Sequence, residues 1–273
     1  MVKGNTRRAR RGMPPEGFIS LSLRAEELSL TVASLRRYVN LGLVRGQVAR
    51  TGNRIYVARD LTPVRARQQR KSLVAMGRVG SLTRETSETR VVVQVGLDGR
   101  GRQYIATGNG MLDHLLQQIA RHGIIDLTVE AHGDGLPDAH HLVEDVAITL
   151  GRAIREAVGD GKGIRRMGSA LVPLDEALAQ VAVDFGGRGY AAVDIPSSGS
   201  HGNGLDSSLV AHFFERLALE GNFNLHARLL TGNDPHHVAE ALFKALARAM
   251  RYALEIDPRV FDQVPSTKGT ISG

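Results

Sequence analysis

The pattern His-His-x-x-Glu occurs twice in the chain, at residues 140–144 and again at 236–240. Imidazole nitrogens and carboxylate oxygens are common ligands of transition metals. In a helix, residues three or four apart share a face, whereas neighbours point about 100° apart. Either histidine of a pair can therefore converge with the glutamate, but both cannot, so each pair is expected to serve two different metal sites.

Two further histidines occupy matching places in two shorter predicted helices that precede the motifs. Together these residues give six imidazoles and two carboxylates, enough for two metal ions with four protein ligands each. Four ligands on a six-coordinate ion leave positions open for a substrate, which favours manganese or iron over a closed structural zinc. The candidate ligands are His114, His140, His141, Glu144, His212, His236, His237 and Glu240.

A single motif of this kind is more often a pair of polar residues at the solvent-facing start of a helix. Two motifs in equivalent positions of a repeat favour metal binding, because solvated histidines have no reason to follow a repeat. His201 and His226 lack such an arrangement and are interpreted as surface or packing residues. His122 and His132 each lie next to a glycine near the predicted site and remain ambiguous.

The elements around the motifs follow the same order in both halves of the chain: strand, strand, helix, strand, helix. This order predicts an internal duplication, with repeats at about 82–168 and 169–273. The expected fold class is α+β, in which two tandem strand-strand-helix-strand-helix repeats form a helix/sheet sandwich beside a small basic N-terminal module. The predicted pairs of strands are 89–108 and 178–196, the shorter helices 110–123 and 206–222, the following strands 124–133 and 223–232, and the longer helices begin at 138 and 234.

The composition is that of a globular protein without thiol chemistry. The chain has 273 residues, 42% of them hydrophobic, and no cysteine. Disulfides, thiolate nucleophiles and cysteine-ligated metals are therefore excluded. No stretch approaches the roughly 18 apolar residues of a membrane span, and the N-terminus lacks the apolar segment of a secretory signal. These features predict a cytoplasmic protein.

Charge divides the chain near residue 80. Residues 1–80 carry 17 Lys and Arg against 4 Asp and Glu, a formal charge of +13. Residues 81–273 carry 18 against 24, a formal charge of −6, together with all ten histidines. Such a shift next to a glycine-containing segment predicts a domain boundary. We expect a basic module at 1–80 and a metal-binding domain at 81–273.

Several longer blocks resemble the imidazoleglycerol-phosphate dehydratase family, in family order and with few shifts of spacing over about residues 82–273. They are "GNGMLDHLLQQIARHG", "DAHHLVEDVAITLGRAI", "GSALVPLDEALAQVAVDFGGRGY", "HHVAEALFKALARAMRYA" and "PSTKG". The resemblance implies a hydro-lyase of histidine biosynthesis that converts imidazole glycerol phosphate to imidazole acetol phosphate and water. It also implies two Mn²⁺ per active site, and a homo-oligomer of 24 subunits built from trimers, with metal sites shared between chains.

The implied chemistry accounts for two metals. The proton to be removed is not adjacent to a carbonyl, so the imidazole ring of the substrate must act as the electron sink. A ring bound by metals at both nitrogens is held as imidazolate, which can expel the neighbouring hydroxyl. By the same resemblance, Glu88 is the acid/base carboxylate. Taken alone, that residue would be interpreted as a solvated glutamate at a strand edge.

The resemblance also implies a set of residues that bind the substrate and its phosphate. Taken singly, each cation among them is more often a solvated surface group. The chain departs from the family pattern at Ala139, where a carboxylate is usual, and near Gly186 and Gly189, where a serine and a proline are usual. The implied substrate and phosphate ligands are Gln118, Arg166, Arg188, Lys244, Ser266 and Lys268.

Residues 28–64, "LSLTVASLRRYVNLGLVRGQVARTGNRIYVARDLTPV", resemble the helix-turn-helix and wing of mercury-resistance-type regulators. This resemblance implies phosphate contacts on DNA from Arg36, Arg37, Arg50 and Arg54. The simpler alternative is a basic appendage that only solubilises the chain or touches neighbouring subunits.

Two other functions fit the motifs. A DNA-binding regulator with a metal- or ligand-sensing C-terminal domain would bind metal without turnover. A metal-storage or structural assembly protein would need the metal ligands but no cations for phosphate.

Overall fold

The computed structural model describes residues 14, 17–28, 32, 35–36, 39, 44–51, 54–60, 62–63, 77–133, 139–196 and 205–271. The chain divides into two compact units, Met1–Gln69 and Arg70–Gly273. Among the described residues, no helix is both long enough and apolar enough to cross a membrane.

The N-terminal unit contains a three-stranded antiparallel sheet in the order β1-β4-β3 and a two-stranded pair, β2 with β5. Ser20 begins the helix α1, because its side chain accepts a hydrogen bond from the backbone N–H of Leu23. A small core of its own includes Leu35 and Val57. The elements are β1 (Phe18–Ser20), α1 (Leu21–Glu27), β2 (Val44–Arg45), β3 (Val48–Thr51), β4 (Arg54–Ala58) and β5 (Thr62–Pro63).

The wing predicted in this unit coincides with the antiparallel hairpin of β3 and β4. Arg50 lies in β3 and Arg54 opens β4, while the side chain of Arg36 is exposed. Arg37 lies outside the described residues. The predicted DNA contacts of these residues stay a prediction.

The larger unit consists of two repeats with the same order of elements, in agreement with the predicted α+β duplication. The first repeat comprises β6 (Val79–Glu85), β7 (Thr89–Gly96), β8 (Gln103–Ala106), α4 (Gly110–Gly123), β9 (Asp126–Gly133) and α5 (Ala139–Val158). The second comprises β10 (Met167–Leu174), β11 (Ala177–Asp184), β12 (Tyr190–Asp194), α6 (Ser207–Gly221), β13 (Asn224–Thr231) and α7 (Pro235–Leu254).

Each repeat begins with one strand more than the sequence pattern predicts. The sheets run β6-β7-β9-β8 and β10-β11-β13-β12, so the additional strands β6 and β10 are edge strands. Edge strands bury less and tolerate Gly and Pro, and β10 contains Gly168 and Pro173. The weak alternation of such strands explains why they were missed. In both sheets the last two strands of the order pair in parallel and the others antiparallel.

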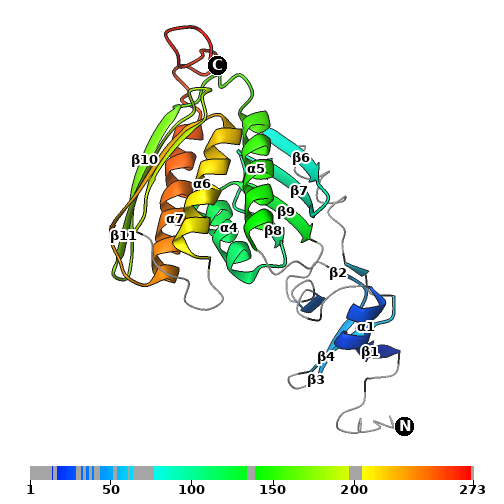
Figure 1. The fold of residues 1–273 in the computed structure, drawn as a ribbon. Coiled ribbons are helices and arrows are strands. Elements are labelled where there is room, and N and C mark those ends of the chain that lie inside the picture. The colour runs from blue at the N-terminus through cyan, green and yellow to red at the C-terminus, as the bar shows by residue number, and fades with distance from the viewer. Residues whose placement is uncertain are drawn as a thin grey trace, which may run out of the picture. The chain divides into compact units, whose positions relative to one another are not determined.

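Helices α4, α5, α6 and α7 lie between the two sheets (Figure 1). Helix α5 covers β6 and β7, and α7 covers β10 and β11. The shorter helices cross over: α4 of the first repeat packs on α7 of the second, and α6 of the second packs on α5 of the first. The two repeats are therefore joined through their helices, and residues from both repeats are brought together.

Close packing in this helical layer depends on aromatic rings and on glycines. The rings of Phe213, Phe214 and Phe243 are fully buried, with centroids of the first two each 5.1 Å from the third. A Cβ on Gly80 would come within 1.9 Å of the Ala153 carbonyl oxygen on α5. A Cβ on Gly168 would likewise come within 2.2 Å of the Ala249 carbonyl oxygen on α7. Only glycine lets these edge strands approach the helices so closely.

Candidate active site

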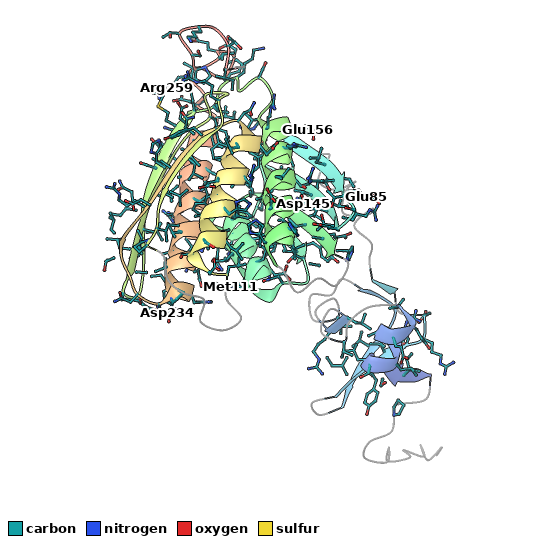
Figure 2. The ribbon with its side chains drawn as sticks, in the orientation of Figure 1. Glu85, Met111, Asp145, Glu156, Asp234 and Arg259 are labelled. Atoms are coloured by element: carbon teal, nitrogen blue, oxygen red, sulfur yellow. The ribbon has the colours of Figure 1, made fainter. Side chains whose placement is uncertain are left out.

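Capping residues begin helices α4, α6 and α7, which carry predicted metal ligands near their starts. Asp234 caps α7, and its side chain accepts hydrogen bonds from the backbone N–H of His236 at 2.8 Å and of His237 at 3.3 Å. Asn109 caps α4 and Asp206 caps α6 in the same way. In Figure 2, Asp234 and Met111 lie at the same end of the layer, and Arg259 lies at the opposite end.

A first cluster joins α4 of one repeat to α7 of the other. Glu240 Oε2 lies 2.8 Å from His114 Nε2 and 3.3 Å from His236 Nε2, and the two imidazole rings stack with centroids 5.4 Å apart. The other oxygen, Oε1, accepts a hydrogen bond from Lys244 Nζ at 2.7 Å. Burial raises the pKa of Glu240, but the hydrogen bonds from Lys244 and His114 outweigh it and bring this pKa down to about 2. The carboxylate is therefore ionised and directed at both imidazoles.

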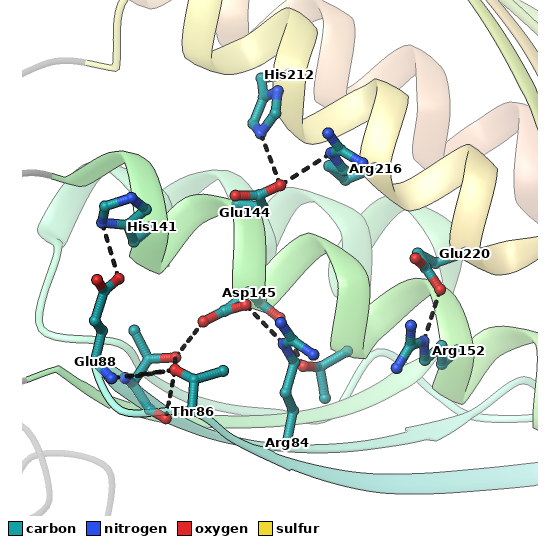
Figure 3. Close-up of polar contacts among 12 residues, drawn as sticks. Arg84, Thr86, Glu88, His141, Glu144, Asp145, Arg152, His212, Arg216 and Glu220 are labelled. Carbon is teal, nitrogen blue, oxygen red and sulfur yellow. Dashed lines mark hydrogen bonds and ion pairs between the residues drawn. The ribbon is translucent and has the colours of Figure 1, made fainter.

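A second cluster repeats this arrangement between α5 and α6. The rings of His140 and His212 stack with centroids 4.6 Å apart. Glu144 Oε1 lies 3.5 Å from His212 Nε2 and 3.1 Å from Arg216 Nε, and Figure 3 shows the carboxylate between these two groups. In each cluster the candidate ligand atoms of three residues lie within 4.8 Å of one another.

The second histidine of each pair lies outside both clusters. His140 and His236 pair with the glutamate four residues on, whereas His141 Nδ1 lies 3.1 Å from Glu88 Oε2 and His237 Nδ1 lies 2.7 Å from Glu176 Oε2. The sequence left open which histidine converges with the glutamate. The structure places three ligands in each cluster within one chain, and leaves one imidazole of each pair directed elsewhere.

A hydrogen-bond network fixes the start of α5 to the strands beneath it. Asp145 is buried and accepts from Arg84 Nε at 2.6 Å and from the Thr89 hydroxyl (Figure 3). Thr89 also belongs to the turn that carries Glu88, because its N–H donates to Thr86 Oγ1 at 3.0 Å. The network therefore holds the Glu88 turn and the ligands of α5 in one rigid arrangement.

The predicted phosphate ligands separate into two groups. Gln118 and Lys244 lie at the first cluster, since Gln118 Nε2 is 3.5 Å from His114 Nε2. Arg166 lies at the other end of α7, where its N–H donates to the Ala253 carbonyl at 2.8 Å. At a rise of about 1.5 Å per residue, His237 and Ala253 are about 24 Å apart along this helix.

The group at the far end is built around the Arg166 guanidinium. It donates to Asp184 at 2.7 and 3.0 Å and to the Pro265 carbonyl at 2.9 Å, which ties the "PSTKG" segment with Ser266 and Lys268 to it. The hydrogen bond to Asp184 raises the pKa of Arg166. Arg166 also has φ +73, a left-handed conformation that is unusual for a residue with a side chain. Arg188 is exposed on the adjacent loop, and Phe185 of that loop donates its N–H to the Arg166 carbonyl at 3.0 Å.

Of the remaining histidines, the three that the structure describes lie outside the clusters. His132 is exposed at the end of β9, and His226 on β13 lies beside Tyr190 with ring centroids 5.9 Å apart. Burial lowers the pKa of His122, and the nearby Lys244 lowers it further. His201 lies outside the described residues.

Comparison with known proteins decides the family. The family model described as imidazoleglycerol-phosphate dehydratase matches residues 107–250. The imidazoleglycerol-phosphate dehydratase of Dehalococcoides mccartyi is 52% identical over 194 residues, which is 71% of this chain and 97% of that protein. The chain belongs to the imidazoleglycerol-phosphate dehydratase family. It is thus a hydro-lyase of histidine biosynthesis, as the sequence motifs predict.

Solved structures of this dehydratase family share the fold. The enzyme from Staphylococcus aureus has a TM-score of 0.59 and 32% identity, covering 66% of this chain and 99% of that one. The enzyme from Pyrococcus furiosus in complex with (S)-C348 has a TM-score of 0.60 and 35% identity, covering 69% of this chain and 99% of that one.

Two departures from the dehydratase pattern have a visible structural context. A Cβ on Gly186 would lie 2.9 Å from Arg166 Nη2, so glycine leaves room for that guanidinium. A Cβ on Gly189 would lie 2.5 Å from the Leu219 carbonyl oxygen at the end of α6. The side chain of Ala139 lies outside the described residues.

Sequence reasoning missed two charged residues of the candidate site, Glu176 at His237 and Arg216 at Glu144. The hydrogen bond from His237 lowers the pKa of Glu176 to about 2, and the same bond raises the pKa of His237. Glu176 occupies the position of Glu88 in the second repeat, so aligning the two repeats could have found it. Arg216 follows His212 by four residues, as Gln118 follows His114 in the first repeat. This equivalent spacing could have identified Arg216 from the sequence.

Proposed function

We propose that this chain dehydrates imidazole glycerol phosphate to imidazole acetol phosphate and water, using two Mn²⁺ per active site. The observation that carries the proposal is the pair of His-His-Glu clusters, each formed across the two repeats and each accompanied by one vicinal histidine that points away. Family membership supplies the substrate, through the printed names of the relatives.

The residues present fit such metals. His212 Nε2 is buried and, among the described residues, has no hydrogen-bond partner, which is costly unless something else binds it. Three nitrogen and oxygen donors per cluster, without sulfur, suit a six-coordinate ion with open positions. The ligands would be His114, His236 and Glu240 at one ion, and His140, Glu144 and His212 at the other. Bound there, such ions would act as Lewis acids on the imidazole ring of the substrate.

The side chains of this chain would then move the proton and orient the substrate. Glu88 has a half-exposed carboxylate beside His141, so it is accessible for removing a proton from a carbon and returning one. Gln118 reaches the first cluster and would donate from its amide to the substrate. Lys244 keeps Glu240 ionised, and its charge lies near enough to attract a phosphorylated substrate.

We propose that a complete site draws on more than one chain. Arg166 is bonded to Ala253, which lies about 24 Å along α7 from His237, and its guanidinium holds Pro265, next to Ser266. One small substrate cannot touch both ends of this helix. His141 and His237, likewise, are directed away from both clusters. In an assembly such as the predicted one of 24 subunits, the Arg166 end of one chain could lie at the clusters of another chain. The outward-directed His141 or His237 could likewise complete a cluster of a neighbour.

A single assay tests the function. Full-length protein loaded with Mn²⁺ is incubated with imidazole glycerol phosphate, and formation of imidazole acetol phosphate is followed. We expect turnover that depends on Mn²⁺ and is lost in His236→Ala. Metal binding without turnover in the wild type would favour the alternative, a DNA-binding regulator that senses metal or ligand.

For residues 1–80 we propose contact with DNA. The observation that favours it is the formal charge of +13 together with a folded hairpin of β3 and β4 in this unit. Binding through phosphates is weakened by salt. Removing residues 1–69, which leaves β6 with Gly80 in place, should abolish retention on duplex DNA at low salt and leave dehydratase activity intact. Equal retention by the truncated chain would leave the segment as an appendage only.

A further inference from the structure

Glu88 and Glu176 occupy the same position in the two repeats. Gly168 follows Gly80 by 88 positions and makes the same close approach to a helix, and Glu176 follows Glu88 by the same 88 positions. Both glutamates are the second residue of a two-residue hairpin turn. The first turn is closed by the Thr86 N–H to Thr89 carbonyl bond at 2.9 Å, and the second by the pairing of Leu174 with Ala177.

The two glutamates also meet equivalent partners. Each contacts Nδ1 of the second histidine of a vicinal pair, at 3.1 Å for Glu88 with His141 and at 2.7 Å for Glu176 with His237. An Nδ1–H bonded to a carboxylate fixes the tautomer and leaves the lone pair on Nε2, which at His237 has Asp175 Oδ2 3.6 Å away. Both contacts therefore prepare an imidazole for ligation at Nε2.

The surroundings of the two carboxylates differ, however. Glu176 Oε1 accepts hydrogen bonds from the backbone N–H of Asp234 at 2.9 Å and of Asn233 at 3.3 Å, at the start of α7. Its two oxygens are thus divided between the helix start and His237. Among the described residues, the Glu88 side chain contacts His141 only. Glu176 is held in place, whereas Glu88 is free to change partners during a reaction.

We propose that Glu176 is a positioning residue, which holds His237 in the rotamer and tautomer that present Nε2 to a metal cluster of a neighbouring chain. The repeat has thereby divided one ancestral position into two roles, proton transfer at Glu88 and ligand orientation at Glu176. This inference rests on the proposed function, because it needs the clusters to bind metal.

The substitution Glu176→Gln separates the two tasks of the carboxylate. A glutamine has one carbonyl oxygen, so it can accept from the helix start or from His237 but not from both, and its NH₂ group then faces the other donor. Glu176→Ala removes both contacts. Asp194→Asn is the control: it removes an exposed carboxylate from the same sheet, and Asp194 pairs with Arg228 rather than with a histidine.

The experiment is titration of metal-free, full-length protein with Mn²⁺, in which free Mn²⁺ is counted by electron paramagnetic resonance. We expect Glu176→Gln and Glu176→Ala to lower the affinity for one of the two Mn²⁺ per chain by about 10- to 100-fold. Loss of a residue that orients a metal ligand typically has an effect of this size. Asp194→Asn should bind both ions as the wild type does. Adding Glu176→Ala to His237→Ala should cost no further affinity, because the residue acts only through that imidazole.

Wild-type affinity for both ions in Glu176→Gln and Glu176→Ala would overturn the inference while leaving the proposed function intact. A melting temperature of the metal-free variants that falls in parallel with affinity would also overturn it, since Glu176 would then only stabilise the hairpin. Failure of the wild type itself to bind Mn²⁺ would instead refute the proposed function.

Discussion

Glu88 is the residue for which the geometry and the proposed chemistry together give the most specific prediction. Its carboxylate touches His141 yet has no second partner among the described residues. In Glu88→Gln the amide oxygen can still accept from Nδ1–H, so Mn²⁺ content should be unchanged. An amide cannot take up the proton, however, and turnover should fall by about 100-fold or more. Metal analysis and steady-state kinetics on the same preparation measure both effects.

Glu85→Gln is the matched control for this variant. Glu85 lies in the same hairpin, is mostly exposed and makes only a 3.7 Å ion pair with Arg90. It should leave both turnover and metal content unaltered. Loss of Mn²⁺ from Glu88→Gln would show that Glu88 orients His141 as Glu176 is proposed to orient His237.

The pH dependence of metal binding also originates in single residues. The pKa of Glu240 is depressed to about 2, so the stability that this carboxylate contributes is present above its unfolded pKa and is lost only as pH falls through about 2. Glu240 is therefore ionised throughout the range in which a free imidazole titrates, near pH 6.5. A protonated imidazole has no lone pair for a metal.

Glu176 raises the pKa of His237, so this imidazole takes up a proton at a higher pH than a free one. We accordingly expect Mn²⁺ affinity at the site that uses His237 to fall with falling pH, beginning above about pH 6.5. Titrations with Mn²⁺ at a series of pH values test this. A midpoint near pH 4 would contradict it and assign the loss to a carboxylate.

At the scale of elements, the close packing of β6 on α5 and of β10 on α7 depends on Gly80 and Gly168. Gly80→Ala and Gly168→Ala would each place a Cβ within 2.2 Å or less of a helix carbonyl oxygen. The strand must then shift, and we expect each variant to lose about 1–3 kcal/mol of unfolding free energy. Denaturant unfolding of metal-free protein measures this loss.

Gly110→Ala provides the control at the start of α4. A Cβ there meets no atom within 4 Å, and alanine favours the helix by about 1 kcal/mol. This variant should be neutral or slightly stabilising. Equal destabilisation by all three substitutions would mean that close approach is not what the two strand glycines provide.

At the scale of the whole molecule, metal should link chains together. Because the assembled form alone presents the complete set of ligands, the free energy of metal binding stabilises that form. Removing metal with a chelator at neutral pH should reduce the protein to trimers or smaller, and Mn²⁺ should restore both size and activity. His141→Ala and His237→Ala should behave like the stripped protein. Light scattering reports the size directly, and a metal-free protein that stays fully assembled would contradict this prediction.

Much of this protein was determined by sequence alone. The doubled His-His-x-x-Glu motif and the order of elements are local or periodic features, and they predicted the α+β duplication. The resemblance of longer blocks to a known family predicted the family and the hydro-lyase class. Helical geometry also required the two histidines of each pair to diverge. The edge strands β6 and β10 were not predicted because their hydrophobic alternation is weak. Gly80 and Gly168 take inward positions, and Met167 and Leu171 are exposed on β10.

The tertiary structure decided which residues meet. Nothing in the sequence shows that α4 packs on α7 and α6 on α5, so that His114 joins Glu240 and His212 joins Glu144 across the two repeats. Nor does it show that Arg166 lies a helix length from His237, or that Glu176 and not only Glu88 contacts a vicinal histidine. Such contacts between distant segments depend on how apolar helix faces pack in the core, which no local pattern encodes.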